Sequence, residues 1–365
     1  MSPVSALLPD FPWDQLAPAK RRAAAHPDGM VDLSMGAPVD PVPDFVRQAL
    51  AAASDAPGYP LTAGTPQLRA ALAAWCVREC RAAPGFGVLP TVGSKELVAW
   101  LPTLLGVGPG DVVVFPEVSY PTYEVGARLA GAVPVRADSL TALGPDTRVK
   151  LVWVNSPGNP TGRVLPAVHL RKVVDWARER GAVVASDECY LPLGWEETPV
   201  SVLDPQVNGG DHRGVLAVHS LSKRSNLAGY RAAFVAGDSA LVDELLLVRK
   251  HAGLIVPAPV QAAMVAALGD EEHVAVQRER YAARRALLRP ALEAAGFRVD
   301  HSAAGLYLWV TRGEPAASTV EWFAARGLLT APGTFYGPGG GAHVRVALTA
   351  SDADTVTAAR RLSDR

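Results

Sequence analysis

The middle of the chain alternates short apolar runs with longer amphipathic segments. Six of these runs predict strands, at residues 112–115, 133–135, 151–154, 182–185, 215–218 and 232–235, and the first of them predicts a buried one. Residues 165–180 place apolar side chains at helical spacing, as Leu170 and Val174 illustrate, and residues 123–129 also predict a helix. Continuous apolar strands joined by helices indicate a mostly parallel sheet that is covered on both faces.

The last third of the chain, after Pro257 and Pro259, has a different pattern of hydrophobic and polar residues. It predicts, in order, a long helix at 271–295, a strand at 306–310, a helix at 320–326, a strand at 343–348 and a final helix. This order predicts a smaller α/β domain, and we expect the N-terminal segment to pack with it. The predicted division is a large domain at residues 45–250 and a small domain formed by residues 1–44 and 251–365.

Composition and charge argue against several classes of partner. Of the 365 residues, 49% are hydrophobic, which is enough for a substantial core. The 35 basic and 36 acidic residues nearly cancel, whereas a protein that binds nucleic acid or a membrane surface usually carries a basic excess. No apolar run approaches the roughly 20 residues that cross a bilayer, and the first residues lack the basic start of a secretory signal. We therefore expect a cytoplasmic protein with neither nucleic-acid nor membrane partners.

The three cysteines are too few for a disulfide framework. Cys76 and Cys80 lie four residues apart on a predicted helix and therefore share a face. Two thiols without a second pair of cysteines or histidines nearby make a poor zinc site. We expect both to be small packing residues, and we expect the protein to hold no metal.

Polar side chains follow three of the predicted strands at the point where each strand ends. The amide of Asn159 follows the strand at 151–154, and the carboxylate of Asp187 and the phenol of Tyr190 follow the strand at 182–185. The hydroxyls of Ser220 and Ser222 and the amine of Lys223 follow the strand at 215–218. In open α/β sheets, ligands bind beyond the carboxyl ends of the strands. We expect these groups to converge on one crevice.

A candidate anion site lies earlier in the chain. The sequence Gly93-Ser94-Lys95-Glu96 comes just before a helix that is predicted to begin near Leu97. Gly93 permits a close approach of the backbone, Ser94 can cap the helix, and the free N–H groups of the first turn point outward. This arrangement suits a phosphate group.

Each of these signals alone has an ordinary structural explanation. A single lysine such as Lys223 is nearly always a solvated surface charge, and Asp187 by itself could cap a helix. Asn159-Pro160-Thr161-Gly162 is a good β-turn sequence. An arginine in an alternating strand, such as Arg345, more often lies at a solvent-facing rim. Only their joint appearance in sheet order separates these residues from ordinary loops.

In these motifs the chain resembles the class I and II aminotransferases, which are fold-type I enzymes dependent on pyridoxal 5'-phosphate (PLP). The matching motifs run in family order from residue 36 to residue 345: Gly58-Tyr59-Pro60, Gly64, Leu68-Arg69, Gly93-Ser94-Lys95-Glu96, Tyr120-Pro121-Thr122-Tyr123, Asn159-Pro160-Thr161-Gly162, Asp187-Glu188-Cys189-Tyr190, Ser220-Leu221-Ser222-Lys223, Gly229-Tyr230-Arg231 and Arg345. The resemblance implies a large domain with a mostly parallel seven-stranded sheet between helices, a smaller α/β domain, and PLP as the cofactor.

The resemblance implies catalytic roles for residues around the cofactor ring. Lys223 would hold the cofactor covalently and, once released, act as the base that moves the Cα proton of the substrate. Asp187 would face the pyridine nitrogen and keep it protonated. Asn159 and Tyr190 would form hydrogen bonds with the phenolic oxygen of the ring, and Tyr120 would stack on the ring face.

The resemblance also implies how the phosphate and the substrate are bound. The phosphate donors would be Ser94, the backbone at Lys95, Ser220, Ser222 and Arg231. Tyr59 would reach the phosphate of the neighbouring subunit's cofactor, which implies a homodimer with shared active sites. Arg345 would bind the substrate α-carboxylate through two hydrogen bonds, assisted by Asn159 and the Gly36 backbone.

Within the family, residues 93–102 are most similar to actinobacterial N-succinyldiaminopimelate aminotransferases. Those enzymes serve lysine and cell-wall precursor synthesis, with glutamate as amino donor and 2-oxoglutarate as its product. Their substrate is long and anionic, so the resemblance calls for cationic or polar groups away from the cofactor. Lys95, Arg163 and Arg22 are candidates by position only.

Three other functions are compatible with part of these motifs. Another class I aminotransferase, with aspartate, alanine or an aromatic amino acid as donor, would leave every cofactor residue unchanged. A PLP-dependent C–S lyase would use the same cofactor set for β-elimination. A regulatory protein that borrows the fold usually carries an added DNA-binding domain, for which we expect this chain to have no spare residues.

Overall fold

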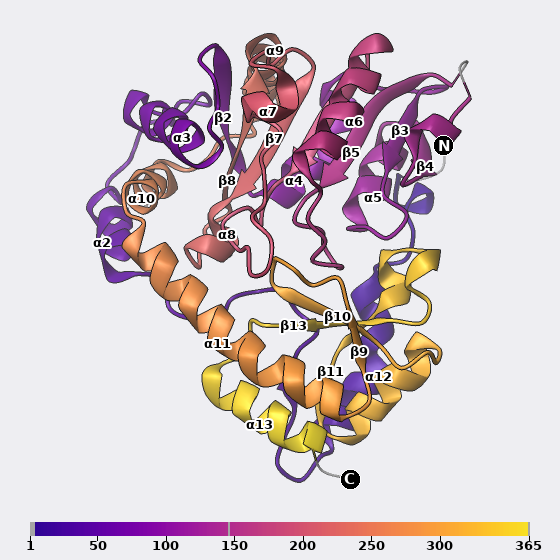
Figure 1. The fold of residues 1–365 in the computed structure, drawn as a ribbon. Helices are drawn as coiled ribbons and strands as arrows, with labels where there is room; N and C mark the ends of the chain where they lie inside the picture. The colour runs from indigo at the N-terminus through magenta and orange to yellow at the C-terminus, as the bar shows by residue number, and fades with distance from the viewer. Residues whose placement is uncertain (1–3, 145–146, 364–365) are drawn as a thin grey trace.

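The structure, a computed structural model, describes residues 4–144 and 147–363 and has two parts (Figure 1). The upper part in that view is an α/β domain around one large sheet, and the lower part is a smaller domain. Helix α11 (Glu272–Ala294) starts beside the upper part and runs across the lower one. None of the described helices is both long enough and apolar enough to cross a membrane.

The large domain is built on a seven-stranded sheet. Its strands are β2 (Phe86–Val92), β3 (Val112–Phe115), β4 (Val133–Arg136), β5 (Val149–Asn155), β6 (Val183–Asp187), β7 (Val215–Ser220) and β8 (Ala232–Asp238). Their order in space is β2-β8-β7-β6-β5-β3-β4, and β8 alone runs antiparallel to its neighbours. The predicted fold class, a mostly parallel seven-stranded sheet with a smaller α/β domain, is confirmed.

Strand β2 is the strand of this sheet that the hydrophobic pattern did not predict. Gly87 and Pro90 interrupt its apolar run. Proline lacks a backbone N–H and is tolerated at sheet edges, and β2 is an edge strand beside β8. A Cβ at Gly87 would lie 2.9 Å from Val242 Cβ, so the glycine lets helix α9 (Ser239–Ala252) pack closely on the strand.

Helices cover both faces of the large sheet. One face carries α3 (Pro66–Glu79), α6 (Ala167–Glu179), α7 (Pro205–Asn208) and α10 (Ala258–Leu268), and the other carries α4 (Ser94–Leu104), α5 (Thr122–Leu129) and α9. Alternate strand residues serve the two faces: Val112 and Val114 join one core cluster, whereas Val113 and Phe115 join the other. Because both faces of the central strands are buried, these strands are continuous apolar runs in the sequence, whereas edge strand β4 is exposed to half-buried.

The small domain combines residues from both ends of the chain. Its antiparallel sheet has the order β12-β13-β10-β9, with the bounds β9 (Arg298–Asp300), β10 (Tyr307–Thr311), β12 (Ala331–Pro332) and β13 (Val344–Ala347). Strand β1 (Val31–Asp32) pairs in parallel with β11 (Leu328–Leu329). The flanking helices are α1 (Ala17–Ala24), α11, α12 (Ala316–Ala325) and α13 (Asp352–Ser363). One core holds Leu16 together with Leu308 and Phe323.

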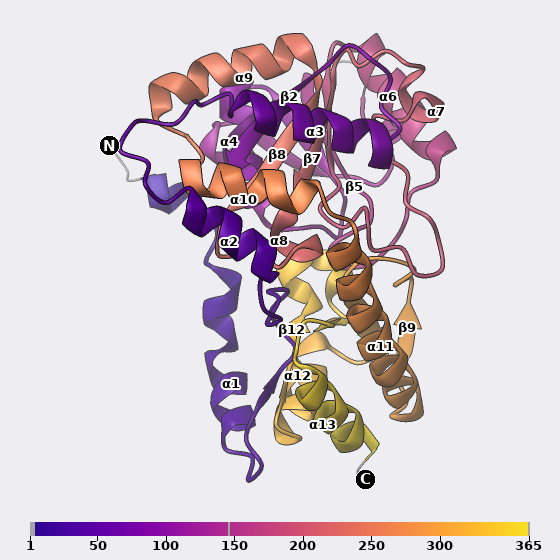
Figure 2. The same ribbon diagram turned by 90° about the vertical axis from the view of Figure 1, so that its left-hand side faces the viewer.

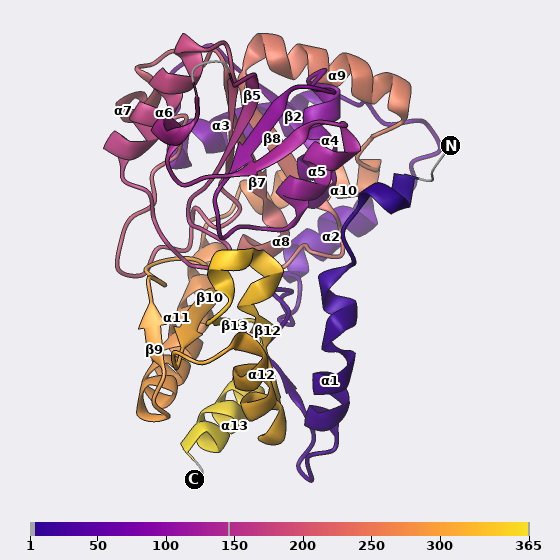
Figure 3. The ribbon, with the colours of Figure 1, turned by 90° about the vertical axis from the view of Figure 1, so that its right-hand side faces the viewer.

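The N-terminal segment runs along the large domain before α1 descends beside the small domain, as Figure 2 and Figure 3 show from two sides. In agreement, η1 (Val4–Leu7) contacts α5, and α1 contacts α12. Short helices complete the chain: α2 (Asp44–Ala52), α8 (Leu221–Arg224), η2 (Pro12–Leu16), η3 (Leu140–Ala142), η4 (Gly333–Tyr336) and η5 (Pro338–Gly340).

The domain limits at residues 44 and 250 stay a prediction. Helix α10 bears on the second limit, because it lies between α2 and α3 (Figure 2) and adds Met264 and Leu268 to the core of the large sheet. Cys76 and Cys80 are buried in the same core, as expected of packing residues.

Candidate active site

A cavity of about 670 Å³ is lined by residues of both domains, at the carboxyl ends of the central strands. Every site residue predicted from the sequence except Tyr59 lines it: Gly36, Ser94, Lys95, Tyr120, Asn159, Asp187, Tyr190, Ser220, Ser222, Lys223, Arg231 and Arg345. The N-terminal segment adds Leu8, Phe11 and Trp13 to the wall. The fold thus brings the predicted polar groups together in one place.

The register of the large sheet places the polar strand ends beside one another. Asn155 pairs with Asp187 between β5 and β6, and Asp187 pairs with Val218 between β6 and β7. The Asn155 amide donates to the Asp187 carbonyl (2.8 Å), and its Oδ1 accepts from the Asn159 N–H (2.7 Å). This buried side chain therefore ties the loop that carries Asn159 to the strand that carries Asp187.

The Asp187 carboxylate lies buried at the end of β6. Its Oδ2 accepts a hydrogen bond from the Tyr123 hydroxyl (2.9 Å), and its Oδ1 accepts one from the Cys189 N–H (3.2 Å). Burial raises the pKa of this carboxyl, while the hydrogen bonds from Cys189 and Tyr123 oppose the rise. A protonated ring nitrogen placed beside it would favour the ionised form.

Lys223 follows β7 in the short helix α8 and lines the cavity. The pKa of its amine falls to about 8, mainly through burial; Arg345 and Arg231 add to this effect, and Cys189 opposes it. Near that pH a large share of the lysine is neutral, which is the form that acts as a nucleophile or a base. The environment therefore prepares this lysine for covalent or proton-transfer chemistry.

The start of α4, Arg231 and two serines form a cradle for an anion. A Cβ at Gly93, where φ is +77°, would lie 2.2 Å from Arg231 Nη2, so glycine lets the guanidinium approach the helix. The expectation that Ser94 caps this helix is wrong, because α4 already begins at Ser94 and Gly93 holds the capping position. Nearby, Ser220 Oγ accepts from the Ser222 N–H (3.1 Å). Free helix N–H groups beside a guanidinium fit a phosphate dianion.

Arg345 on β13 is buried, and three segments of the chain hold its guanidinium. Its Nη1 donates to Asn159 Oδ1 (3.0 Å), and its Nη2 donates to the Ser34 carbonyl (2.6 Å). The guanidinium carbon lies 4.0 Å from the centroid of the Tyr307 ring. Within the described residues its Nε has no hydrogen-bond partner. A buried cation with a free donor at a cavity wall suits a carboxylate.

Tyrosine hydroxyls supply neutral donors to the cavity. The hydroxyls of Tyr190 and Tyr307 lie 2.9 Å apart. Burial raises the pKa of Tyr190, and it raises the pKa of Tyr120 to about 12, so both remain protonated at neutral pH. The Tyr120 ring meets Tyr123 edge-on, with centroids 5.8 Å apart.

Of the three candidates for a second cationic anchor, Lys95 is the one that lines this cavity. Its Nζ lies 5.3 Å from the centroid of the Phe11 ring. Burial and then Arg231 lower the pKa of Lys95. Arg163 lines a separate cavity, and Arg22 forms an exposed ion pair on α1.

Tyr59 is the predicted site residue that does not line the cavity. Its side chain is 99% exposed in the single chain. Because the family resemblance assigns it to the cofactor of a neighbouring subunit, its position within one chain leaves that role a prediction.

No role was predicted from the sequence for Tyr123 and Asn155, which support residues of the site, or for Tyr307 and residues 8–13, which contribute to the cavity wall. Tyr123 follows Tyr120 at helical spacing, and Asn155 is the first polar residue after its strand, so both carried a signal that could have been used. Tyr307 and the segment at residues 8–13 carry no local signal, because apolar and aromatic residues there are indistinguishable from core residues in the sequence.

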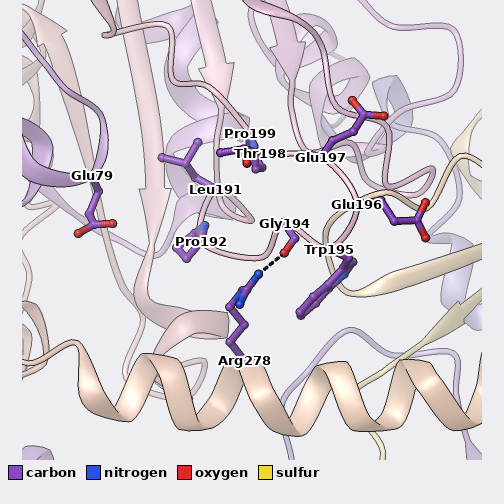
Figure 4. A pocket seen from close by; sticks show the side chains of 10 residues that line it. All are labelled: Glu79, Leu191, Pro192, Gly194, Trp195, Glu196, Glu197, Thr198, Pro199 and Arg278. Atoms are coloured by element: carbon purple, nitrogen blue, oxygen red, sulfur yellow. Dashed lines mark hydrogen bonds between the residues drawn. The ribbon is translucent and has the colours of Figure 1, made fainter.

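A second cavity of about 360 Å³ lies beside α11 (Figure 4). Arg278 points into it and donates to the Gly194 carbonyl (2.6 Å), with its guanidinium carbon 5.4 Å from the centroid of Trp195. None of the site residues predicted from the sequence lines this cavity. The first cavity is therefore the candidate active site.

One group of metal-ligating side chains occurs within the described residues: Cys80, Glu188 and His219, whose ligand atoms all lie within 4.8 Å of one another. His219 Nδ1 has no hydrogen-bond partner there, whereas a metal-binding histidine almost always donates from its other nitrogen. The Arg224 cation lines the same small cavity and would repel a metal ion. These features argue against a metal, whose absence stays a prediction.

Comparison with known proteins gives consistent matches over nearly the whole chain. The family model for class I and II aminotransferases matches residues 28–362. A probable aminotransferase of Mycobacterium tuberculosis is 64% identical over 362 residues, which are 99% of this chain and 86% of that protein. A 4-dedimethylamino-4-oxo-anhydrotetracycline transaminase of Streptomyces rimosus is 60% identical over 357 residues, which are 98% of this chain and 99% of that protein.

Proteins named for diaminopimelate are more distant. An LL-diaminopimelate aminotransferase of Desulforudis audaxviator is 35% identical over 354 residues, which are 91% of this chain and 89% of that protein. A solved structure of a probable N-succinyldiaminopimelate aminotransferase from Thermus thermophilus has a TM-score of 0.84 and 29% identity. The match covers 97% of this chain and 99% of that one.

Proposed function

The chain belongs to the class I and II aminotransferases, and we propose that it is an N-succinyl-LL-2,6-diaminopimelate:2-oxoglutarate aminotransferase. Like its family, it is a PLP-dependent enzyme. The observation that carries the choice of substrate is the presence of Arg345 and Lys95 in the wall of one cavity. A substrate with one carboxylate at the reacting carbon and another at a distance can pair with both cations.

The residues around the ring divide the chemistry between them. When bound, PLP supplies an electron sink for the electron pair left behind by the Cα proton. Lys223 would hold the cofactor, and its Nζ would serve as the base that moves the Cα proton of the substrate. Asp187, which Tyr123 holds in place, keeps the ring nitrogen protonated. Tyr190 donates to the phenolic oxygen of the ring.

Asn159 and Tyr120 complete the surroundings of the ring. Asn159 Oδ1 already accepts from Arg345, which leaves its Nδ2 free to donate to the phenolic oxygen. Tyr120, which lines the cavity, would cover the ring face. The same Asn159 thereby couples the position of the ring to the guanidinium that receives the substrate α-carboxylate.

The phosphate is held at the start of α4. Its donors are Ser94, the backbone N–H at Lys95, Ser220, Ser222 and Arg231, as the anion cradle supports. Tyr59 reaches the phosphate bound in a second copy of the chain. The exposure of Tyr59 in the single chain supports such a homodimer with shared active sites.

A bulky ring ketone is the second candidate substrate. The Streptomyces rimosus relative is named for an anhydrotetracycline substrate, and the cavity here is walled by Phe11, Trp13 and Met35. Such a wall offers a large ring system more apolar contact than a flexible anionic chain needs. The two candidates share every cofactor residue and differ in what the far side of the cavity must accept.

A substrate panel separates the candidates. The purified enzyme is given 2-oxoglutarate with N-succinyl-LL-2,6-diaminopimelate, aspartate, alanine or an aromatic amino acid, and kcat/KM is compared. We expect the succinylated donor to be preferred; equal or better use of an ordinary amino acid contradicts the proposal. Pyruvate and ammonia from cysteine-like substrates would instead identify a C–S lyase, and amination of a tetracycline-type ketone by glutamate would favour the second candidate.

The role of Lys95 is tested with Lys95→Met and its matched control Lys95→Arg. Loss of a charge-assisted contact should lower kcat/KM for the succinylated donor roughly 10- to 100-fold in Lys95→Met. Alanine, which has no distant carboxylate, should be used equally by both variants, and Lys95→Arg should retain most activity. A parallel loss with both donors means that Lys95 acts on the cofactor instead, which absorbance of the bound PLP would show.

A further inference from the structure

Tyr307 begins β10 in the small domain and touches three parts of the active site at once. It is 3% exposed, and it lies on the strand next to the one that carries Arg345. Its hydroxyl meets Tyr190, its ring lies under the Arg345 guanidinium, and its far end lies against Gly36.

The proposed role of Tyr190 determines which hydroxyl is the donor in the Tyr190–Tyr307 hydrogen bond. If Tyr190 uses its own proton to donate to the phenolic oxygen of the cofactor, its oxygen must act as the acceptor in the Tyr190–Tyr307 pair at 2.9 Å. Tyr307 is then the donor. A hydroxyl that accepts one hydrogen bond donates a stronger one, so Tyr307 strengthens the donation by Tyr190.

The contact with Arg345 orients the substrate-binding cation. The guanidinium carbon lies 4.0 Å from the centroid of the Tyr307 ring, within the range of a cation–π contact. Two hydrogen bonds, to Asn159 Oδ1 and the Ser34 carbonyl, hold the Nη atoms. These two hydrogen bonds alone would let the guanidinium plane tilt about the line that joins its two Nη atoms. The Tyr307 ring, which lies against that plane, limits the tilt.

The contact with Gly36 explains why this position has no side chain. A Cβ at Gly36 would lie 2.0 Å from the Tyr307 hydroxyl oxygen. Any larger residue at position 36 would force that hydroxyl to move and so disturb its contact with Tyr190. The absence of a side chain at Gly36 therefore leaves room for the Tyr307 hydroxyl beside Tyr190. This role is additional to any contact of the Gly36 backbone with substrate.

We propose that Tyr307 is a positioning residue that aligns both the Tyr190 hydroxyl for the cofactor and the Arg345 guanidinium for the substrate carboxylate. The inference rests on the proposed roles of Tyr190 and Arg345, but not on the identity of the substrate. Any donor that the panel shows to be used, glutamate included, therefore serves for the test.

Two variants test separately the two parts of the proposal: alignment of the Tyr190 hydroxyl (the Tyr190 arm) and alignment of the Arg345 guanidinium (the Arg345 arm). Tyr307→Phe removes the hydroxyl and keeps the ring, whereas Tyr307→Leu removes both. In Tyr307→Phe, the pH midpoint of the visible absorption of the bound cofactor should rise by at least about half a unit, because Tyr190 stabilises the ionised phenolic oxygen less well. KM for the amino donor should change less than about twofold. In Tyr307→Leu, the same shift should appear and KM should rise about five- to tenfold.

Controls keep the test independent of folding. Gly36→Ala should reproduce the pH shift although Tyr307 is intact. Tyr230→Phe removes a hydroxyl outside the cavity and should leave both readouts unchanged. An unshifted midpoint in folded Tyr307→Phe overturns the Tyr190 arm, and an unchanged KM in Tyr307→Leu overturns the Arg345 arm. If Tyr307→Leu does not fold, Tyr307→Phe and Gly36→Ala still test the Tyr190 arm of the proposal.

Discussion

The two sides of the active-site cavity are built in different ways. The large-domain side consists of adjacent strand ends: Asp187 ends β6, Lys223 follows β7, and Asn155 at the end of β5 ties the loop that carries Asn159 to β6. The opposite side is assembled from segments remote in sequence: Arg345 is held by Ser34 and Asn159, and Phe11 and Trp13 come from the N-terminal segment. In the proposed function, the first side would hold the cofactor, and the second would supply the cation for the substrate α-carboxylate, while Lys95 of α4 in the large domain would be the second cationic anchor. The proposed proton-transfer chemistry and the binding of the α-carboxylate therefore depend on different parts of the fold.

The largest effect should come from the cofactor side. Asp187→Ala should still bind PLP through the phosphate cradle and Lys223, but turnover should fall roughly a thousandfold or more, because the ring nitrogen loses its anionic partner. Steady-state kinetics and the absorbance of the bound cofactor measure the two properties separately. Tyr123→Phe, which removes one hydrogen bond to Asp187, should fall between this variant and the wild type. Substantial activity in Asp187→Ala would contradict the role of the carboxylate.

The substrate side should give a smaller and different loss. Arg345→Ala should lower kcat/KM for amino donors roughly 100-fold, mainly through KM, because the α-carboxylate loses its buried cation. Arg345→Lys should recover part of this loss, since lysine keeps the charge but not the two-pronged geometry. Both variants should still bind PLP, even though Arg345→Ala removes the hydrogen bond to Asn159. A variant that loses PLP instead would show that the two sides are not separable.

The pH dependence of cofactor attachment should report on Lys223. Its amine has a pKa of about 8, lowered mainly by burial, so the neutral and nucleophilic form increases as the pH rises through that value. Attachment of PLP to the apoenzyme should accelerate about tenfold between about pH 7 and pH 9 and then level off. A rate that still climbs toward pH 10.5 would indicate an unperturbed lysine. Borohydride reduction and peptide mapping should place the label on Lys223.

A chelator should have the smallest effect. Neither side of the cavity contains a group of metal-ligating residues among those described, and the Cys80–Glu188–His219 group lies in the core. Overnight dialysis against EDTA should leave activity and thermal stability unchanged, and elemental analysis should find no stoichiometric metal. A metal that is lost together with activity would require a new account of that group.

The same contrast explains what could be predicted from the sequence. The cofactor side follows from local order, because a residue directly after a buried strand must emerge at the edge of the sheet. Six of the seven strands carry a continuous apolar pattern, whereas Gly87 and Pro90 conceal β2. The helix start was placed too late because the positive φ of Gly93 ends the strand and lets α4 begin at Ser94.

The substrate side could not be predicted in the same way. The contact of Arg345 with Ser34 joins residues 311 positions apart, and that of Tyr190 with Tyr307 joins residues 117 positions apart. The first depends on how the N-terminal segment packs within the small domain, and the second on how the small domain docks against the large one; no local pattern encodes either. Tyr307 was predicted only as part of a strand, because an aromatic residue in a buried strand has no feature that separates packing from function.

The hydrogen bonds of Arg345 have a consequence for the energetics of substrate binding. The guanidinium already joins the N-terminal segment at Ser34 and the large domain at Asn159 from a strand of the small domain. An arriving carboxylate therefore meets a cation whose rotamer and surroundings are fixed. The loss of conformational entropy that accompanies ordering a long, flexible side chain occurs once, when the protein folds, and need not recur at each turnover.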